Sequence, residues 1–234
     1  MQALPKSRLL RFVEQAYHLA RRAVARYSSK FSKRRYTLHQ HIVLLCLKVR
    51  KNTTYRGLLD ELIEMPRIRR AIELEELPSP YSTLYKMAVW RVLLNLSVTL
   101  LPTNGVVGID ASGFERSHAS KHYTKRAKLT IQQLKITLLV DTRSNAILDV
   151  HVTTTRKHDS KIAPSLIKHR EFSSLHKAWN ARLDAGLYGQ RSQNETVNSR
   201  LKRKYGAFVR SRYWWKQFRE LVVGCLTHNI DKAL

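Results

Sequence analysis

The sequence predicts an α/β fold, in which a helical amino-terminal module precedes an antiparallel three-stranded sheet with flanking helices. Apolar residues recur at helical spacing through most of the first hundred residues. After Gly105 the pattern changes to short apolar runs and then to alternation, which is typical of strands. From Tyr188 to Lys202 polar residues recur at helical spacing again. We therefore expect two domains, residues 1–100 and residues 104–234.

The chain is strongly basic. Its 234 residues include 43 Lys and Arg against 17 Asp and Glu, a formal net charge of +26. Because contacts of Lys and Arg with phosphates release counterions, this charge indicates a polyanionic partner, with an acidic membrane surface as the alternative. No apolar run reaches the roughly 18–20 residues that span a bilayer, and no signal segment is evident. Two distant cysteines, Cys46 and Cys225, are predicted to be buried thiols in a reducing cytoplasm.

Four helices are expected in the amino-terminal module. The first has apolar positions between Leu9 and Ala20, and the second spans Thr37–Val49. Thr53 can cap a third helix that runs to about Met65 and ends at Pro66, and the fourth spans Ser82–Leu100. Basic amphipathic helices of this kind either hold a DNA end or simply form a core, and the spacing leaves both interpretations open.

Three strands are expected next. The runs at residues 106–114 and 131–140 are short and apolar, and residues 145–154 alternate, with Leu148, Val150 and Val152 expected on one face. A tight-turn sequence at residues 141–145 joins the last two into a hairpin. Helical spacing resumes at His158.

The segment from Tyr188 to Lys202 contains a single carboxylate in a largely basic stripe. Steps of three, four, three and four residues place its members on one helix face: Tyr188, Arg191, Glu195, Asn198 and Lys202. Such a stripe suits a metal ion beside a phosphate. On spacing alone, however, it is more typical of a solvated helix face that carries ordinary ion pairs.

The pattern Tyr-x2-Arg-x3-Glu-x6-Lys resembles the motif of DDE insertion-sequence transposases of bacteria and archaea, and all four positions match. The resemblance implies a ribonuclease-H-like fold for the second domain. It implies that Asp110, in Gly108-Ile-Asp110-Ala-Ser, and Glu195 are catalytic carboxylates that bind Mg²⁺ or Mn²⁺. It further implies that Tyr188, Arg191 and Lys202 position Glu195 and the DNA backbone.

The family's middle carboxylate has no counterpart here. In the family it ends a fourth strand, but only 28 residues separate Asp159 from Tyr188, too few for a crossover helix, a strand and its connections. We infer an internal deletion near Leu166 to Lys168, which leaves the second domain incomplete between about residues 160 and 187. Loss of a strand also predicts unpaired sheet edges and low stability. Five remaining acids are more typical of turns, caps or surfaces than of ligands: Asp141, Asp149, Asp159, Glu171 and Asp184.

Further basic residues are candidates for DNA contact. Six are expected to do so: Arg203, Lys204, Arg210, Arg212, Lys125 and Arg126. Aromatic residues lie among them after residue 205 and suit base stacking. We interpret four residues instead as the core stripe of the final helix: Trp214, Phe218, Leu221 and Val222. The pair His118 and His122 has metal-like spacing only in a helix, and its loop context argues against a metal site.

The sequence thus predicts a cytoplasmic transposase that binds the double-stranded terminal inverted repeats of a mobile element. It is expected to bind DNA without cutting it, because the middle Asp is missing. Whether it forms a homo-oligomer is left open. One alternative is a non-catalytic remnant that occupies element ends or co-assembles with an intact transposase. Another is a cytosolic RNA-binding protein, which only the charge supports.

Overall fold

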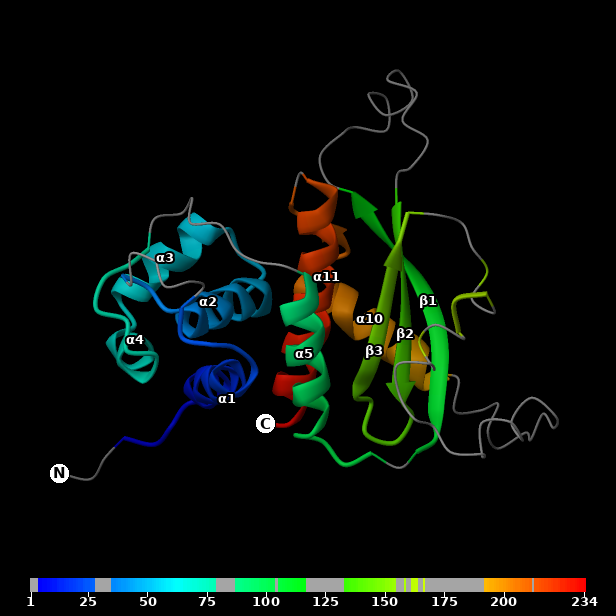
Figure 1. Ribbon diagram of the computed structural model, residues 1–234, viewed down its shortest axis with the longest axis horizontal. Coiled ribbons are helices and arrows are strands. Elements are labelled where there is room, and N and C mark those ends of the chain that lie inside the picture. Colours follow the sequence, from blue (N-terminus) through cyan, green and yellow to red (C-terminus); the bar gives the residue numbers. More distant parts are fainter. Residues whose placement is uncertain are drawn as a thin grey trace, which may run out of the picture.

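The computed structural model describes the following residues: 4–27, 35–78, 87–103, 105–116, 133–154, 158, 161–163, 166, 192–211 and 213–234. Helices α1 to α4 form a helical lobe, and a four-stranded sheet lies on the other side of the molecule (Figure 1). Helices α5 and α11 stand between them and contact both the helical lobe and β3.

The helical lobe contains three helices that were predicted and a short fourth one, α4, that was not; the fourth expected helix, Ser82–Leu100, is α5 (Met87–Val98), outside the lobe. The lobe contains α1 (Arg8–Ala23), α2 (Leu38–Arg50), α3 (Tyr55–Ile63) and α4 (Pro66–Ala71). Thr37 caps α2 in a reciprocal capping box with Gln40. The cap of α3 is Thr54, one residue later than predicted. Pro66 follows the end of α3 and is the first residue of α4. Proline is tolerated at this position because the N–H groups of the first helical turn have no partner within the helix, so the N–H that proline lacks is not missed.

The sheet has the order β3-β2-β1-β4. Strands β1 (Val107–Arg116), β2 (Gln133–Asp141) and β3 (Ile147–Thr153) are antiparallel, which confirms the three predicted strands. The fourth, β4 (Phe208–Val209), pairs in parallel with Glu115 and Arg116 and was not predicted. Two residues are too few to show a strand pattern. Within the described residues, β4 is the sole partner on that edge of β1.

A β-bulge overturns one predicted face. Leu139 is paired with Asp149 and the next residue, Val140, with Ile147, so Leu148 is an extra residue on β3. Leu148 packs with Leu139 and Ala146 in a small cluster, whereas Val150 and Val152 belong to the main core. The prediction that Leu148 shares a face with Val150 and Val152 is therefore wrong.

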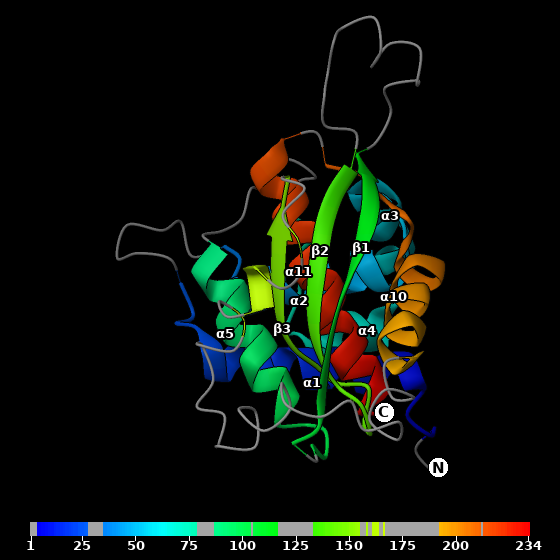
Figure 2. The same ribbon diagram turned by 90° about the vertical axis from the view of Figure 1, so that its right-hand side faces the viewer.

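In Figure 2, α11 (Trp214–Lys232) lies behind the strands, with α5 (Met87–Val98) to the left of β3 and α10 (Ser192–Tyr205) to the right of β1. A single hydrophobic cluster joins them to the sheet and to the helical lobe, and includes Phe12, Leu44, Trp90, Ile136 and Val222. The cluster contains residues from both sides of position 100, where the sequence analysis placed a domain boundary. That boundary stays a prediction.

The buried part of the final helix, α11, begins further along the chain than its sequence pattern predicts. Leu221 and Val222 are buried, and Phe218 packs against the core, as expected. Trp214 is 58% exposed, so its predicted place in the core stripe is wrong. The reason is its position in the first turn of α11, beyond the part of the helix that the sheet and α5 cover.

Both cysteines are free and buried, as the sequence predicts. Burial raises the pKa of the Cys46 thiol to about 12, and it raises the pKa of Cys225 as well. Neither thiol is therefore ionised at neutral pH.

Asp231, near the end of α11, joins four helices. Its carboxylate accepts hydrogen bonds from Arg50 Nε (2.8 Å), Lys204 Nζ (2.7 Å) and the Tyr205 hydroxyl (3.0 Å). Its carbonyl oxygen accepts one from Arg8. Burial alone would raise the pKa of this carboxyl, but Lys204 and Arg50 outweigh that effect and lower it below 3.8. The ionised carboxylate therefore stabilises the contact between α1, α2, α10 and α11.

Replacing Asp231 by Asn should lower the free energy of unfolding at pH 7 by about 3 kcal/mol. This is the low end of the range for a broken buried ion pair, because Lys204 is 40% exposed whereas Arg50 is 14% exposed. The folded-state pKa lies below the unfolded value, so this stability is present above about pH 4 and is lost as the pH falls through the folded-state value. Denaturant unfolding of both proteins from pH 7 to pH 3 measures the difference.

The matched control is Glu14→Gln, which removes an acid from the exposed Lys6–Glu14 pair and should cost under about 1 kcal/mol. Equal effects of the two substitutions, or a gap for Asp231→Asn that does not change with pH, would contradict this role.

Candidate functional site

Helix α10 lies along β1, and the two elements touch at three successive levels. Asn194 lies against Gly108, Asn198 contacts Asp110, and Lys202 lies over Phe114. Because the residue numbers of α10 and those of β1 increase together from one level to the next, the helix and the strand run in the same direction. The structure thus places Asn198 beside Asp110, and Lys202 beside Phe114 about one helical turn further along α10.

The first level is a close approach that requires glycine. A Cβ atom on Gly108 would lie 2.3 Å from Asn194 Nδ2 and 2.8 Å from its Oδ1. Asn194 is fully buried, and neither of its amide atoms has a hydrogen-bond partner among the described residues. Packing against β1, rather than a hydrogen bond, therefore holds this side chain.

The second level holds the predicted catalytic aspartate. Asp110 is half-buried on β1, and its Oδ2 accepts a hydrogen bond of 2.9 Å from Asn198 Nδ2. Asn198 is 5% exposed, and its Oδ1 has no hydrogen-bond partner within the described part of the chain. Sequence reasoning put Asn198 in the stripe but gave it no role. The signal was its spacing, three residues after Glu195.

Glu195 lies in the first turn of α10 and is exposed. Residues three apart on a helix are neighbours on its surface, so Glu195 lies beside the Asn198–Asp110 contact on the solvent side. The buried face of α10 is formed by other residues: Asn194, Val197, Asn198 and Leu201. Two further members of the predicted stripe, Tyr188 and Arg191, lie outside the described residues.

The third level places a cation on an aromatic ring. Lys202 Nζ lies 5.6 Å from the centroid of the Phe114 ring, and Phe114 itself is buried. A cation over a ring face is weakly attracted to it, which holds the Lys202 chain along β1. The charge of Lys202 is therefore kept on the same side of α10 as Asn198.

The described carboxylates do not assemble a complete metal site. No group of three or more His, Cys, Asp or Glu that could hold a metal ion occurs in the described ranges. Asp141 is buried in the β2–β3 turn, where Arg143 N, Ser144 N and Ser144 Oγ donate to it. Asp149 is buried and accepts from the N–H of Val150. Three other acids considered above lie outside the described residues: Asp159, Glu171 and Asp184.

Asp110 and Glu195 carry the oxygen ligands that Mg²⁺ or Mn²⁺ prefers. Two metal ions need about three carboxylates. Among the described residues no such set of three is found, and we derive no cleavage step from these two carboxylates.

The predicted DNA-binding residues have different surroundings. Arg203 is exposed on α10. Lys204 is paired with Asp231, and Arg210 donates to the carbonyl and side-chain oxygens of Asn52. The other predicted residues lie outside the described part of the chain: Arg212, Lys125 and Arg126, together with His118 and His122.

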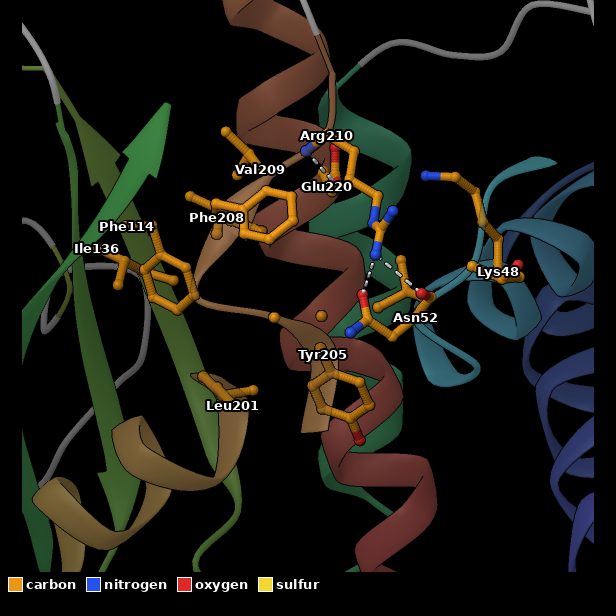
Figure 3. A pocket seen from close by; sticks show the side chains of 15 residues that line it. Lys48, Asn52, Phe114, Ile136, Leu201, Tyr205, Phe208, Val209, Arg210 and Glu220 are labelled. Atoms are coloured by element: carbon orange, nitrogen blue, oxygen red, sulfur yellow. Dashed lines mark hydrogen bonds between the residues drawn. The ribbon is translucent and has the colours of Figure 1, made fainter. Parts of the chain in front are cut away.

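A small pocket that the sequence did not indicate lies between α2, α10 and β4 (Figure 3). Its inner wall is apolar, with Phe114 and Leu201, and its rim includes Lys48, Arg210 and Glu220. Its volume is about 30 Å³, which admits a few waters and no nucleotide. Burial lowers the pKa of the Lys48 ammonium group. The positive charges of Arg210 and Arg219 lower it further, whereas the negative charge of Glu220 raises it.

Comparison with known proteins gives one match. Residues 102–179 match the family model described as "Transposase DDE domain", about a third of the chain. The matched segment includes β1, β2 and β3 with Asp110, and ends before α10. Searches of curated proteins and of solved structures each found no match. No described helix is long and apolar enough to cross a membrane. Over the matched segment, the chain is similar to DDE transposases, which supports a transposase function.

The approach of α10 to β1 is testable by adding one methyl group. Gly108→Ala should lower the free energy of unfolding by about 1–3 kcal/mol, because the new Cβ overlaps Asn194 and forces α10 away from β1. Gly224→Ala in α11 is the matched control, since no atom lies within 4 Å of its added Cβ. It should be neutral or stabilising by up to about 1 kcal/mol. Denaturant unfolding compares the two, and an unchanged stability of Gly108→Ala would refute the close contact.

Proposed function

We propose that this protein is a DNA-binding transposase of the DDE insertion-sequence group whose strand cleavage and transfer are impaired. In this proposal its second domain is a ribonuclease-H-like domain shortened by an internal deletion, and it binds the terminal inverted repeats of a mobile element as double-stranded DNA in the cytoplasm. The observation that carries the proposal is the hydrogen bond between Asp110 and α10. Asp110 lies on β1, inside the segment that is similar to the transposase family.

The roles of individual residues follow from that contact. Asp110 and Glu195 would be the metal ligands, with Asn198 holding the Asp110 carboxylate by a hydrogen bond. Lys202, kept on the same side of α10, would bind a DNA phosphate together with exposed Arg203. Tyr188 and Arg191 would act beside Glu195, as the sequence motif implies. Mg²⁺ or Mn²⁺, when bound, would stabilise the charge that develops on phosphate oxygens.

Impaired cleavage is proposed from the sequence, which has no counterpart of the family's middle carboxylate. With fewer ligands, two metal ions are held weakly, whereas phosphate binding by Lys and Arg needs no metal. DNA binding and cleavage are therefore separable in this chain.

The same observations support a second candidate, a non-catalytic remnant that occupies element ends or co-assembles with an intact transposase. The two candidates differ in residual chemistry. The impaired enzyme retains slow metal-dependent nicking, and the remnant has none.

The purified protein should bind a labelled duplex that carries the terminal inverted repeat, and its affinity should fall steeply as salt rises, because counterion release drives binding. Lys202→Ala should weaken this binding and lower the salt dependence by about one phosphate contact. Lys232→Ala, at the exposed far end of α11, is the control for loss of one positive charge. Equal affinity of all three proteins in filter binding would count against the proposed DNA contact.

Nicking of the same duplex should be absent or very slow with either Mg²⁺ or Mn²⁺. Asp110→Ala should leave duplex binding intact, because Asp110 is hydrogen-bonded to the neutral Asn198 amide and supplies no positive charge for a phosphate. Efficient nicking by the unmodified protein, abolished in Asp110→Ala, would show an intact active centre and overturn the impairment.

A further inference from the structure

Exposed aromatic side chains are concentrated from β4 to the first turn of α11. Four of the seven large hydrophobic side chains that are markedly exposed among the described residues lie between positions 208 and 215. Tyr213 is 63% exposed, Trp214 58% and Trp215 40%. Tryptophan is usually well buried, so two adjacent exposed tryptophans indicate a surface that contacts something else. We call Tyr213, Trp214 and Trp215 the aromatic platform.

The rings of the aromatic platform are held in fixed planes. Tyr213 and Trp215 are stacked, with ring centroids 6.4 Å apart and an angle of 19° between planes. Trp214 packs edge to face with Phe218, at 4.9 Å and 87°. Because Phe218 packs against the core, this contact fixes the plane of the Trp214 indole while more than half of it stays exposed. Such rings lose little conformational entropy when a flat ligand stacks on them.

Cations surround the platform. Lys216 Nζ lies 5.2 Å from the Tyr213 ring and 5.1 Å from the Trp215 ring, and the Arg219 guanidinium lies 5.8 Å from Trp215. Burial lowers the pKa of Arg219, with Glu220 opposing the shift. The carboxylate of Glu220 is already engaged, since it accepts hydrogen bonds from the N–H groups of Arg210 and Ser211 and from the Ser211 hydroxyl.

We propose that the aromatic platform stacks unpaired bases of a DNA strand, while Lys216 and Arg219 bind the adjoining phosphates. Flat rings take the faces of bases without regard to sequence, and nearby cations neutralise the backbone. A paired duplex hides its base faces, so the surface selects DNA that is melted or single-stranded. This inference rests on the proposed DNA-binding function and specifies the form of DNA that one surface takes.

The charge of this region favours nucleic acid over an apolar protein partner. Between Thr196 and Arg219 the sequence has eight Lys and Arg and no Asp or Glu, within a chain of net charge +26. A second copy of this chain would bring an equally basic surface against it, which costs free energy by repulsion between like charges.

The test compares a single-stranded oligothymidylate with the inverted-repeat duplex, by fluorescence anisotropy of labelled DNA at one salt concentration. Trp214→Ala should weaken single-strand binding by about 5-fold to about 150-fold, the range for one lost stacking contact. Trp214→Phe should restore most of it, because phenylalanine also stacks. Duplex affinity should change less than about twofold in both variants, since phosphate contacts dominate it.

Val92→Ala is the matched control, because Val92 is 45% exposed on α5 away from the platform, and it should change neither affinity. Thermal melting should stay near that of the unmodified protein for Trp214→Ala, since an exposed side chain is removed. Single-strand affinity that is unchanged in Trp214→Ala would overturn this inference and leave the proposed function standing. A change in oligomeric state on sedimentation, without loss of single-strand binding, would overturn it in favour of a contact between chains.

Discussion

The contact of α10 with β1 is the constraint on which the candidate site depends. Gly108 lets Asn194 approach the strand, and that approach sets the distance at which Asn198 reaches Asp110 and Lys202 reaches Phe114. An asparagine amide, not a second carboxylate, is thus the neighbour that the described structure gives to Asp110. An amide holds one carboxylate oxygen in place but adds no negative charge for a divalent cation.

Helix α11 holds that arrangement in the rest of the molecule. Near its end, Asp231 ties α11 to α2 and α10 through Arg50 and Lys204, and the buried Asn229 side chain exchanges two hydrogen bonds with the backbone of Ile147 on β3. The orientation of α10 on β1 is therefore linked to the helical lobe through buried polar contacts. The opposite end of α11 carries the aromatic platform, so one helix has a structural end and an exposed, basic end.

Much of this fold could be predicted from spacing alone, because periodicity reports which side chains share a face. It located α1, α2 and α3 of the lobe, the three antiparallel strands and α10 within a few residues, but not the short helix α4. It did not reveal β4, which is too short to show a pattern, or the bulge at Leu148, which arises from pairing with β2. In the site, the motif pointed to Asp110 and the α10 stripe. The exposure of Trp214 and the pairing of Lys204 with Asp231 depend on tertiary packing, which local spacing does not encode.

We propose above all that Asp110 lies in an incomplete metal centre of a DNA-binding protein. Titration of Mn²⁺ into the protein bound to its inverted-repeat duplex, followed by electron paramagnetic resonance, tests it most directly, with the Asp110→Asn complex as reference. The account predicts weak uptake of Mn²⁺ well below two ions per chain, and still weaker uptake by the Asp110→Asn complex, because one ligand carboxylate is lost. Tight binding of about two Mn²⁺ per chain that Asp110→Asn abolishes would contradict it, because two ions need a complete set of carboxylates.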